Sequence, residues 1–241
     1  MSFSHQVHQS RVCPTAQPDL GPTLQLVLAS NNAKKLAELR ALLAGLPVSI
    51  LTQGELGIAE VDEPHHTIVE NALCKARHAA AACGGAALAD DSGLCVHALG
   101  GAPGVRSAHF GGLLARAQSE DREALRRRQD AVNNAALLAS LEAVTQRRAH
   151  FISTLVALRH ADDPEPLVAV GRWAGEVLTA PRGTAGFGYD PLIFIPALGA
   201  TVAELSDEVK NSHSHRARSA MVLRAMLAEA WRLDASRLGA A

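Results

Sequence analysis

Residues 24–51 constrain the fold more than any other part of the 241-residue chain. Residues 24–29 are almost all apolar and run into a short polar turn, which is typical of a buried strand. Leucines then recur at helical spacing over residues 36–46, and Pro47 ends that pattern. Residues 48–51 are again apolar and favour a second strand. A strand, a helix and a strand in this order predict the opening of an α/β domain.

The same signals predict the remaining elements. Helical periodicity covers residues 67–83 and 119–145, and a last helix, capped within residues 212–216, extends to Trp231. Five segments have strand patterns, and the third and fourth are expected to form an antiparallel hairpin: residues 86–89, 94–96, 149–160, 166–178 and 192–195. Apolar positions of two helices are assigned to the core: Ile68, Val69, Ala72, Leu73, Ala76, Met221, Leu223, Leu227 and Trp231.

Composition narrows the class of protein. The net charge is -1 and only 3% of residues are aromatic, which argues against a nucleic-acid-binding surface. There is no apolar run long enough for a membrane span. The four cysteines form no C-x-x-C pair, so we expect a cytoplasmic protein without a disulfide framework. Residues 1–23 are interpreted as a disordered leader, residues 24–235 as one domain with two lobes, and residues 236–241 as a tail.

Two adjacent acids, Asp90 and Asp91, stand where the strand at residues 86–89 is expected to end. Ser92 and Gly93 follow, so the backbone there is expected to turn. Paired carboxylates at a strand end suggest a hard cation such as Mg²⁺. A solvated Asp pair in a turn explains the same residues equally well.

Other acids of the chain are candidates for the same metal site. Glu63 lies in the acidic turn at residues 60–64, and it and Asp91 are placed to hold a cation from two sides of a cleft. The helical pair Glu70 and Asn71 could orient them. The alternative is that Glu63 and Glu70 are simply solvated.

Anion and base recognition have separate candidates. Residues 30–35, with the sequence Ser-Asn-Asn-Ala-Lys-Lys, lie between a strand and a helix N-terminus, which favours phosphate, although a plain helix cap is the simpler reading. Phe187, Tyr189 and Asp190 concentrate scarce aromatics in a glycine-rich loop, either as a base-stacking wall or as core anchors of a turn. Three residues near another helix start add donors for a keto oxygen: Lys210, His215 and Arg216.

Two further patterns do not indicate a binding site. His213 and His215 lack a third ligand for zinc. The arginine run at residues 126–128 is interpreted as a solvated helix face.

Six of these motifs occur together in one order. They are Ser30-Asn31-Asn32-x-x-Lys35-x-x-Glu38, Glu70-Asn71-Ala72, Ala89-Asp90-Asp91-Ser92-Gly93-Leu94, Gly100-Gly101-Ala102-Pro103-Gly104, Gly186-Phe187-Gly188-Tyr189-Asp190-Pro191 and Ser214-His215-Arg216. In this the chain closely resembles the inosine triphosphate pyrophosphatase family, the dITP/XTP "house-cleaning" nucleotide hydrolases, over residues 24–231.

The resemblance implies an elongated, two-lobed α/β fold with a central mixed sheet flanked by helices and a nucleotide cleft between the lobes. It also implies a homodimer with one Mg²⁺ per subunit that splits ITP, dITP or XTP into the monophosphate and pyrophosphate. Asp91 then matches the catalytic acid, and Glu63 and Asp91 match the metal ligands. The positions that match substrate-binding residues are Ser30, Asn31, Asn32, Ala33, Lys34, Lys35, Ser92, Phe187, Gly188, Tyr189, Asp190, Lys210, His215 and Arg216.

The chain departs from the family pattern in three places. Ser107-Ala108-His109-Phe110 stands where the family often has an arginine and an aromatic residue. The segment at residues 111–134 is longer and richer in arginine than is usual in the family. The leader at residues 1–23 has no counterpart in the family. Three other functions were considered. A Maf-like pyrophosphatase is opposed by the Asp-Asp-Ser-Gly and Ser-His-Arg motifs, a nucleotide-binding regulator does not need the acids, and a nucleic-acid-binding protein is opposed by the near-neutral charge.

Overall fold

Seven strands form one mixed sheet in the computed structural model of the chain, which describes residues 23–233. Their order across the sheet is β2-β1-β3-β4-β5-β6-β7. The bounds are Leu24–Leu28 (β1), Val48–Thr52 (β2), Ala87–Val96 (β3), Arg148–Leu158 (β4), Leu167–Val177 (β5), Ile193–Ile195 (β6) and Ala200–Thr201 (β7). Apart from Thr23, the predicted leader lies outside the described residues, as does the tail at residues 236–241.

The register of β3 with its two neighbours shows which part of its edge has no paired strand. β1 pairs in parallel with β2 and β3, but its register with β3 covers only Ala87 and Leu88. The other edge of β3 is antiparallel to β4 over its whole length, from Ala87 to Val96. Beyond Leu88, no described strand therefore pairs with the β1 side of β3. Residues 102–107 cover its last part, where the N–H of Leu94 donates to Ser107 Oγ and the N–H of Val96 donates to the carbonyl oxygen of Ala102. We call the uncovered part of β3, residues 89–93, the free edge.

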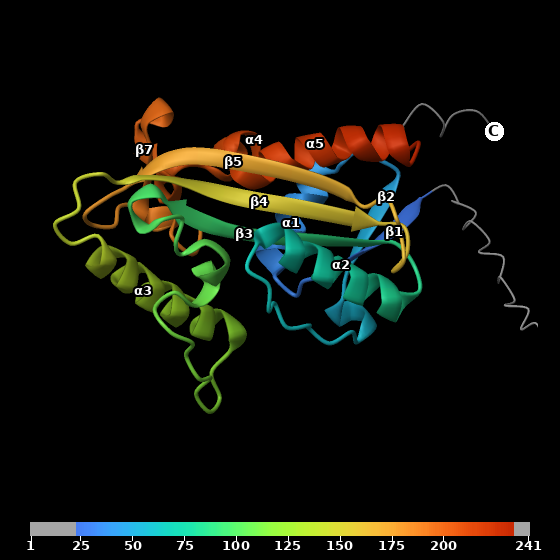
Figure 1. Cartoon of the computed structure of the whole chain (residues 1–241), viewed down its shortest axis with the longest axis horizontal. Coiled ribbons are helices and arrows are strands. Elements are labelled where there is room, and N and C mark those ends of the chain that lie inside the picture. Colours follow the sequence, from blue (N-terminus) through green and yellow to red (C-terminus); the bar gives the residue numbers. More distant parts are fainter. Residues whose placement is uncertain (1–22, 234–241) are drawn as a thin grey trace, which may run out of the picture.

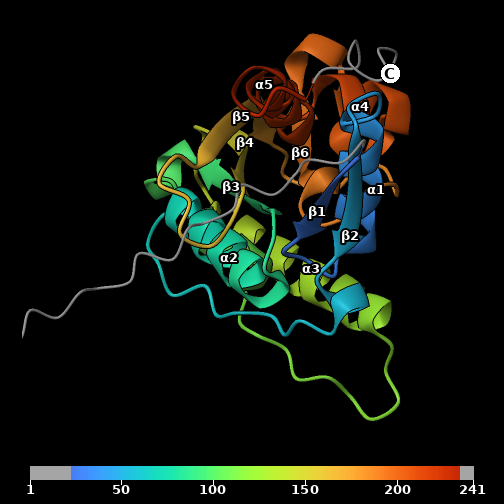
Figure 2. The same cartoon turned by 90° about the vertical axis from the view of Figure 1, so that its right-hand side faces the viewer.

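Five helices cover the sheet. They are α1 (Ala33–Leu42), α2 (Ile68–Cys83), α3 (Arg122–Ser140), α4 (Asp207–His213) and α5 (His215–Ala230). Figure 1 shows an elongated molecule in which β3, β4 and β5 run lengthwise, with β1 and β2 near one end and α3 near the other. In both views α2 and α5 lie on opposite faces of these strands (Figures 1 and 2). The predicted mixed sheet flanked by helices is confirmed.

Side-chain caps explain where the helices begin. Asn32 accepts hydrogen bonds from the backbone of Lys34 and Lys35 at the start of α1, and Thr67 and Ser214 cap α2 and α5 in the same way. The prediction for the last helix is confirmed, because α5 begins at His215 with Ser214 as its cap and ends beside Trp231; a short helix that the sequence did not predict precedes it. Residues 207–213 form the separate helix α4, because Ser214 is extended at φ -63° and ψ 162° and interrupts the helical backbone.

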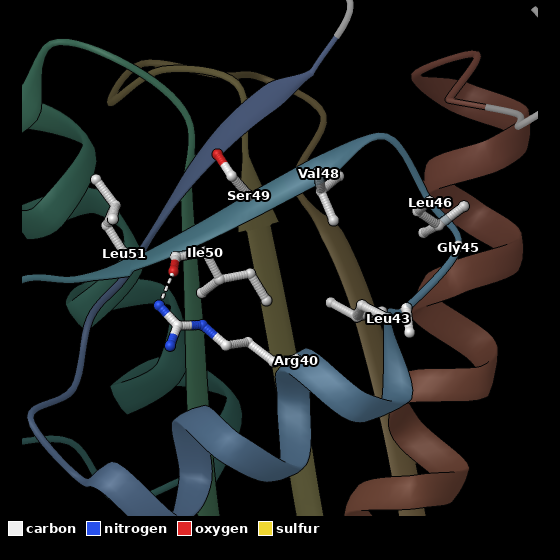
Figure 3. A pocket seen from close by; sticks show the side chains of 9 residues that line it. Arg40, Leu43, Gly45, Leu46, Val48, Ser49, Ile50 and Leu51 are labelled. Atoms are coloured by element: carbon white, nitrogen blue, oxygen red, sulfur yellow. Dashed lines mark hydrogen bonds between the residues drawn. The ribbon is translucent and has the colours of Figure 1, made fainter. Parts of the chain in front are cut away.

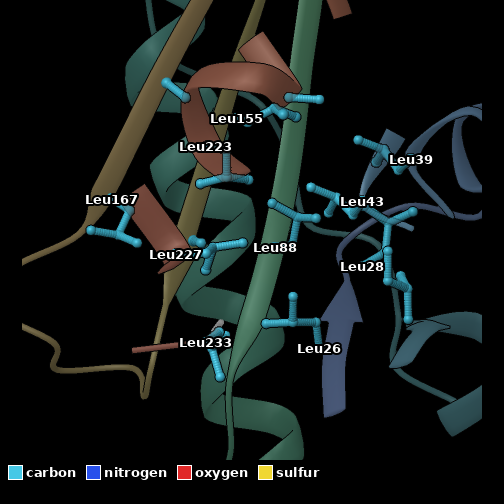
Figure 4. Close-up of a cluster of buried hydrophobic side chains, with 14 of the residues drawn as sticks. Leu26, Leu28, Leu39, Leu43, Leu88, Leu155, Leu167, Leu223, Leu227 and Leu233 are labelled. Atoms are coloured by element: carbon cyan, nitrogen blue, oxygen red, sulfur yellow. The ribbon is translucent and has the colours of Figure 1, made fainter. Parts of the chain in front are cut away.

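The apolar core lies on both faces of the sheet. One cluster joins β1, β3, β4 and β5 to α1 and α5 and is built mainly from leucines (Figure 4). A second packs the alanines of α2 on β1, β3 and β4, and a third joins the far ends of β3, β4 and β5 to α3. Among the residues that the structure describes, no helix is long and apolar enough to cross a membrane.

Two core assignments are wrong. Val69 is 41% exposed and Met221 is 67% exposed, whereas the other predicted residues of these helices are buried or, for Leu73, half-buried. Met221 lies two residues before the buried Leu223, and two residues turn a helix by about 200°, so their side chains point in nearly opposite directions. Apolar character alone does not distinguish the two faces of α5.

The acid motif also differs from its prediction. We expected two short strands around a turn at Ser92 and Gly93, but β3 continues through both residues and pairs with β4 at each of them. Gly93 is required for a different reason. A Cβ atom there would lie 2.4 Å from the carbonyl oxygen of Gly104, so only glycine allows residues 104–109 to pack on the strand.

A hydrogen-bonded carboxylate, that of Asp163, stabilises the turn between β4 and β5. The carboxylate of Asp163 accepts hydrogen bonds from the Arg159 guanidinium and from the backbone N–H groups of Arg159 and Glu165. Burial opposes its ionisation, but these donors lower the pKa of Asp163 to about 2. We expect Asp163→Ala to lower the free energy of unfolding at pH 7 by about 2–3 kcal/mol, because charged hydrogen bonds are lost from a buried acceptor.

Urea denaturation at several pH values tests this expectation. The folded pKa lies below the usual value of about 4, so the stabilisation is present above pH 4 and is lost as the pH falls towards 2. The difference between wild type and variant should shrink over that range. A constant difference from pH 7 down to pH 2 would show that the charge of Asp163 is not responsible.

Candidate active site

The two adjacent acids of β3 point to opposite faces of the sheet. Successive side chains of a strand alternate, so Asp90 faces α1 and α5 whereas Asp91 faces α2. Both are almost completely buried. Their position is next to the carboxyl end of β1, where β3 loses its parallel neighbour. A site is expected at such a place in an α/β sheet.

Asp91 forms one half of an acid pair that shares a lysine. The ammonium of Lys75, on α2, lies 2.9 Å from Asp91 Oδ1 and 3.2 Å from Glu63 Oε2. Burial raises the pKa of Asp91 to about 6; Lys75 opposes this shift and the nearby Glu63 adds to it. The carboxylates keep the pKa of Lys75 above its usual value despite burial. The structure thus brings Glu63 and Asp91 together, as expected, through a lysine that sequence reasoning did not identify.

The loop that carries Glu63 is fixed by α2. Asn71, on the first turn of that helix, accepts a hydrogen bond from the N–H of His65 and donates one to the carbonyl oxygen of His65. Glu70 bonds to the Thr67 hydroxyl at 2.5 Å and so belongs to the helix cap rather than to the acid pair. Within residues 23–233 neither Glu70 nor Asn71 hydrogen-bonds to Glu63 or Asp91, and Asn71 holds the loop two residues after Glu63.

Asp90 is the centre of a buried ionic network. Its carboxylate accepts hydrogen bonds from Arg216 Nε at 2.8 Å and from Ser153 Oγ at 3.0 Å, and Lys35 Nζ lies 3.2 Å away. Burial opposes ionisation, but Arg216 and Lys35 hold the pKa of Asp90 well below its usual range. Arg216 also pairs with Glu38 of α1. Asp90 therefore binds the first turn of α5 to β3 and α1.

The turn at residues 30–35 leads from β1 to α1 beside the free edge. Ser30 Oγ accepts from the N–H of Asn32, and Asn31 donates to Glu60. Lys35 Nζ and Lys75 Nζ converge on the backbone carbonyl oxygen of Asp90, at 3.2 and 3.4 Å. Ala33 and Lys34 are exposed at the start of α1. Two ammonium groups from different helices thus meet at the edge where the acids lie.

The glycine-rich loop separates its two aromatic residues. The Phe187 ring is half-buried, with Lys210 Nζ 4.4 Å and Lys34 Nζ 5.6 Å from its centre. Tyr189 is buried in the core, and its hydroxyl donates to the carbonyl oxygen of Ser107 at 2.9 Å. Phe187 is thus a half-buried ring with two ammonium groups over it, whereas Tyr189 is a core anchor, as in the alternative interpretation. Gly188 lies between them in the left-handed region.

Asp190 and Lys210 form a buried ion pair behind Phe187. Lys210 Nζ lies 2.9 Å from Asp190 Oδ2, and the same oxygen accepts from the N–H of Phe187 at 3.0 Å. Burial raises the pKa of Asp190, and Lys210 opposes that shift. Lys210 is also 3.7 Å from Glu38, so the pair joins the Asp90 network through Glu38.

His215 and Ser92 complete the predicted set. The His215 ring is buried against Phe151, with ring centres 5.0 Å apart, and its Nδ1 has no hydrogen-bond partner in residues 23–233. Burial lowers its pKa well below the usual value, so the ring is neutral at pH 7. Ser92 Oγ is 3.4 Å from Arg216 Nη2. His213 is exposed and pairs with Ser212 instead.

Metal binding by three or more side chains is not indicated. Within the described part of the chain, no group of three or more His, Cys, Asp or Glu residues is arranged to hold a metal ion. The Glu63 and Asp91 carboxylates offer two oxygen ligands on either side of an ammonium, which is a donor set suited to Mg²⁺ with water and phosphate as its other ligands.

Two surface hollows help to locate the site. One of about 350 Å³ lies between α1 and β2, where Arg40 donates to the carbonyl oxygen of Ile50 at 2.7 Å (Figure 3). It contains none of the predicted site residues. The other, of about 400 Å³, is lined by Lys34, α3 and the loop around Phe187. The candidate site therefore extends from the free edge towards α3.

Sequence reasoning missed two kinds of residue in this region. Lys75 and Ser153 contact the acids from α2 and β4, and Asp130 and Asn134 of α3 contact the glycine-rich loop. Of residues 107–110, where the chain departs from the family pattern, Ser107 is buried and structural, whereas Ala108 and His109 are exposed. Ser107 bonds to Leu94 and Gly104, and its carbonyl oxygen accepts from Tyr189.

Comparisons with known proteins identify the family. A model of the Ham1 family matches residues 26–226. The chain is 64% identical over 208 residues to the dITP/XTP pyrophosphatase of Methylibium petroleiphilum, covering 86% of this chain and 99% of that relative. It is 64% identical over 211 residues to the dITP/XTP pyrophosphatase of Leptothrix cholodnii, covering 87% and 100%.

Solved structures match as well. A HAM1 protein from Coxiella burnetii superimposes with a TM-score of 0.77 at 40% identity, covering 86% of this chain and all of that one. The Nucleoside-triphosphatase / dITP/XTP pyrophosphatase of Mycobacterium abscessus gives 0.62 at 37% identity, covering 83% and 98%. The resemblance drawn from the six motifs is confirmed, and the chain belongs to the Ham1 family.

Proposed function

We propose that the chain hydrolyses deaminated purine nucleoside triphosphates, namely ITP, dITP and XTP, to the monophosphate and pyrophosphate. Its relatives bear the name dITP/XTP pyrophosphatase at 64% identity over nearly their whole length. The observation that carries the proposal is the group at the free edge. The Glu63–Lys75–Asp91 cluster lies next to Lys35 at the start of α1, and a half-buried aromatic ring with cationic neighbours lies nearby.

Glu63 and Asp91 would hold the magnesium ion. They are the two carboxylates that share the Lys75 ammonium, so the cluster already accommodates positive charge between them. When bound, Mg²⁺ neutralises phosphate charge and orients the triphosphate. In this proposal each subunit of a homodimer holds one such ion.

Asp91 would act as the proton acceptor for the attacking water. In the cluster without a metal ion, burial raises the pKa of Asp91 to about 6, so its carboxylate is ionised at neutral pH and can accept a proton in the transition state. The water oxygen bonds to the α-phosphorus, its proton passes to Asp91, and the bond from the α-phosphorus to the bridging oxygen breaks to release pyrophosphate. Lys35 and Lys75 stabilise the charge that collects on the leaving phosphates.

The base would bind at the other end of the site. The Phe187 ring offers a stacking surface, and the cationic groups of Lys210 and Arg216 lie in the network behind it. These donors suit the keto oxygen of hypoxanthine or xanthine, and they do not suit the amino group of adenine. His215 is neutral and buried beside Arg216, where it can discriminate between donor and acceptor edges.

The experiment that tests the function is a substrate panel. Purified protein with Mg²⁺ is incubated with ITP, dITP, XTP, GTP and ATP, and pyrophosphate and orthophosphate are measured separately. We expect pyrophosphate release that is at least about a hundredfold faster for the deaminated purines than for ATP, because unmatched buried donors penalise the wrong base. Equal slow turnover of all five, orthophosphate as product, or binding of dITP without turnover would overturn the proposal.

A further inference from the structure

Helix α3 binds both backbone polar groups of one residue in the glycine-rich loop. Asp130 Oδ2 accepts a hydrogen bond from the backbone N–H of Gly188 at 2.8 Å. Asn134 Nδ2 donates to the carbonyl oxygen of Gly188 at 3.0 Å. The two side chains are four residues apart, so they lie on the same face of α3. Together they bind both polar groups of one residue, and we refer to them as the α3 clamp.

Gly188 is the residue at which such a clamp has most influence on the loop. Its φ of 63° lies in the left-handed region, where the backbone is held by its hydrogen bonds rather than by side-chain packing. It separates Tyr189, which is buried, from Phe187, which is half-buried. The N–H of Phe187 donates to Asp190 Oδ2 and its carbonyl oxygen accepts from the N–H of Asp190, so Gly188 lies inside a turn that Asp190 closes. The α3 clamp therefore holds the middle of this turn, one residue from the Phe187 ring.

The clamp borders the place where a ligand would bind. Asp130 and Asn134 line the hollow of about 400 Å³ together with Lys34 and Phe187. Asp130 is not in a salt bridge with any residue of the described range, and Asn134 Oδ1 has no hydrogen-bond partner there. Within the described residues, the hydrogen bonds of both side chains thus go to Gly188.

We propose that Asp130 and Asn134 are positioning residues for the base of the substrate. They hold Gly188 so that the Phe187 ring stands beside Lys210 as a stacking surface. This inference rests on the proposed function. It gives the arginine-rich helix α3 a role in base recognition. That role depends on Asp130 and Asn134, which face the glycine-rich loop, and not on the arginines at residues 126–128.

Substitution of Asp130 separates base binding from triphosphate binding. In Asp130→Ala the N–H of Gly188 loses its acceptor, so the KM for dITP should rise about tenfold while kcat changes less than about twofold, because base stacking contributes about 1–3 kcal/mol. The inhibition constant of inorganic tripolyphosphate, which has no base, should stay the same. Asp130→Asn retains an oxygen acceptor and should restore most of the affinity for dITP.

Two further variants complete the test. Asn134→Ala removes the second contact and should also raise the KM, so it serves if Asp130→Ala does not fold. Ser140→Ala is the matched control, since Ser140 is on the same helix and bonds only to Ala136. An unchanged KM in both clamp variants, or equal weakening of dITP and tripolyphosphate, would overturn the inference.

Failure of the proposed function is visible separately. If wild type does not release pyrophosphate from dITP, the enzyme proposal fails in the wild-type assay itself. The clamp is then tested by calorimetric binding of dITP and tripolyphosphate to the wild type and the variants. A selective tenfold loss for dITP supports the clamp even in that case, and no selective loss contradicts it.

Discussion

Asp91→Asn should reduce turnover of dITP by about a thousandfold, which is within the range of a general base. The amide has nearly the shape of the carboxylate but cannot accept the proton of the attacking water and binds Mg²⁺ poorly. Initial rates of pyrophosphate release at saturating Mg²⁺ measure the loss. Activity within tenfold of wild type would remove Asp91 from the proposed mechanism.

The same variant should remain folded. Lys75 keeps Glu63 as a partner at 3.2 Å, so no buried charge is left alone. In the wild type, the folded pKa of about 6 lies above the usual value, so the contribution of Asp91 to stability is greatest below pH 4 and declines as the pH rises through 6. Urea denaturation without divalent cations should therefore show the variant gaining stability relative to wild type over that range. A relative loss would contradict the assigned direction.

The Asp90→Asn variant should have a much lower free energy of unfolding than wild type. The chemical change is the same as in Asp91→Asn, one residue earlier in β3. Removing one partner of a buried ion pair typically costs about 3–5 kcal/mol, and here Arg216 and Lys35 both lose their partner on β3. That cost is a large part of the total stability of a domain, which is about 5–15 kcal/mol. Urea denaturation at pH 7 should show a clearly lower midpoint.

The comparison of the two variants is the control for both predictions. The change in shape and charge is identical, and only the direction of the side chain differs. If Asp90→Asn is as stable as wild type, the network of Asp90 with Arg216 is not important for folding. If both variants lose activity and stability to the same degree, the separation of a structural and a catalytic acid is wrong.

The helix starts and the β4–β5 hairpin could be predicted because they depend on residues that are close together in the sequence. The start of α2 at Thr67 and of α1 at Asn32 follows from caps that involve residues two or three positions apart. The hairpin of β4 and β5 follows from two alternating segments around Asp163. Such signals are contained in a short window, so they can be recognised without knowing the rest of the fold.

Continuity of β3 and the faces of α5 could not be predicted in this way. Asp91, Ser92 and Gly93 have turn-forming character, but β4 pairs with every one of them and keeps the strand extended. On α5 the exposure of Met221 depends on which face meets β5, and no feature of that helix alone decides it. Tyr189 is a core residue because Ser107, far along the chain, provides the acceptor for its hydroxyl.

The sequence by itself determined the family and the order of most elements, and it predicts that Asp91, Glu63 and the turn at residues 30–35 belong to one site. Only the tertiary structure decided how these groups are paired. Lys75 reaches Asp91 from α2 and Asp130 reaches Gly188 across 58 positions, because burial between packed elements selects partners by position in space. Helix caps and hydrophobic periodicity depend on residues that are close in the sequence. The interactions between the charges of this site depend instead on their separation in space, which is set when the helices and strands pack.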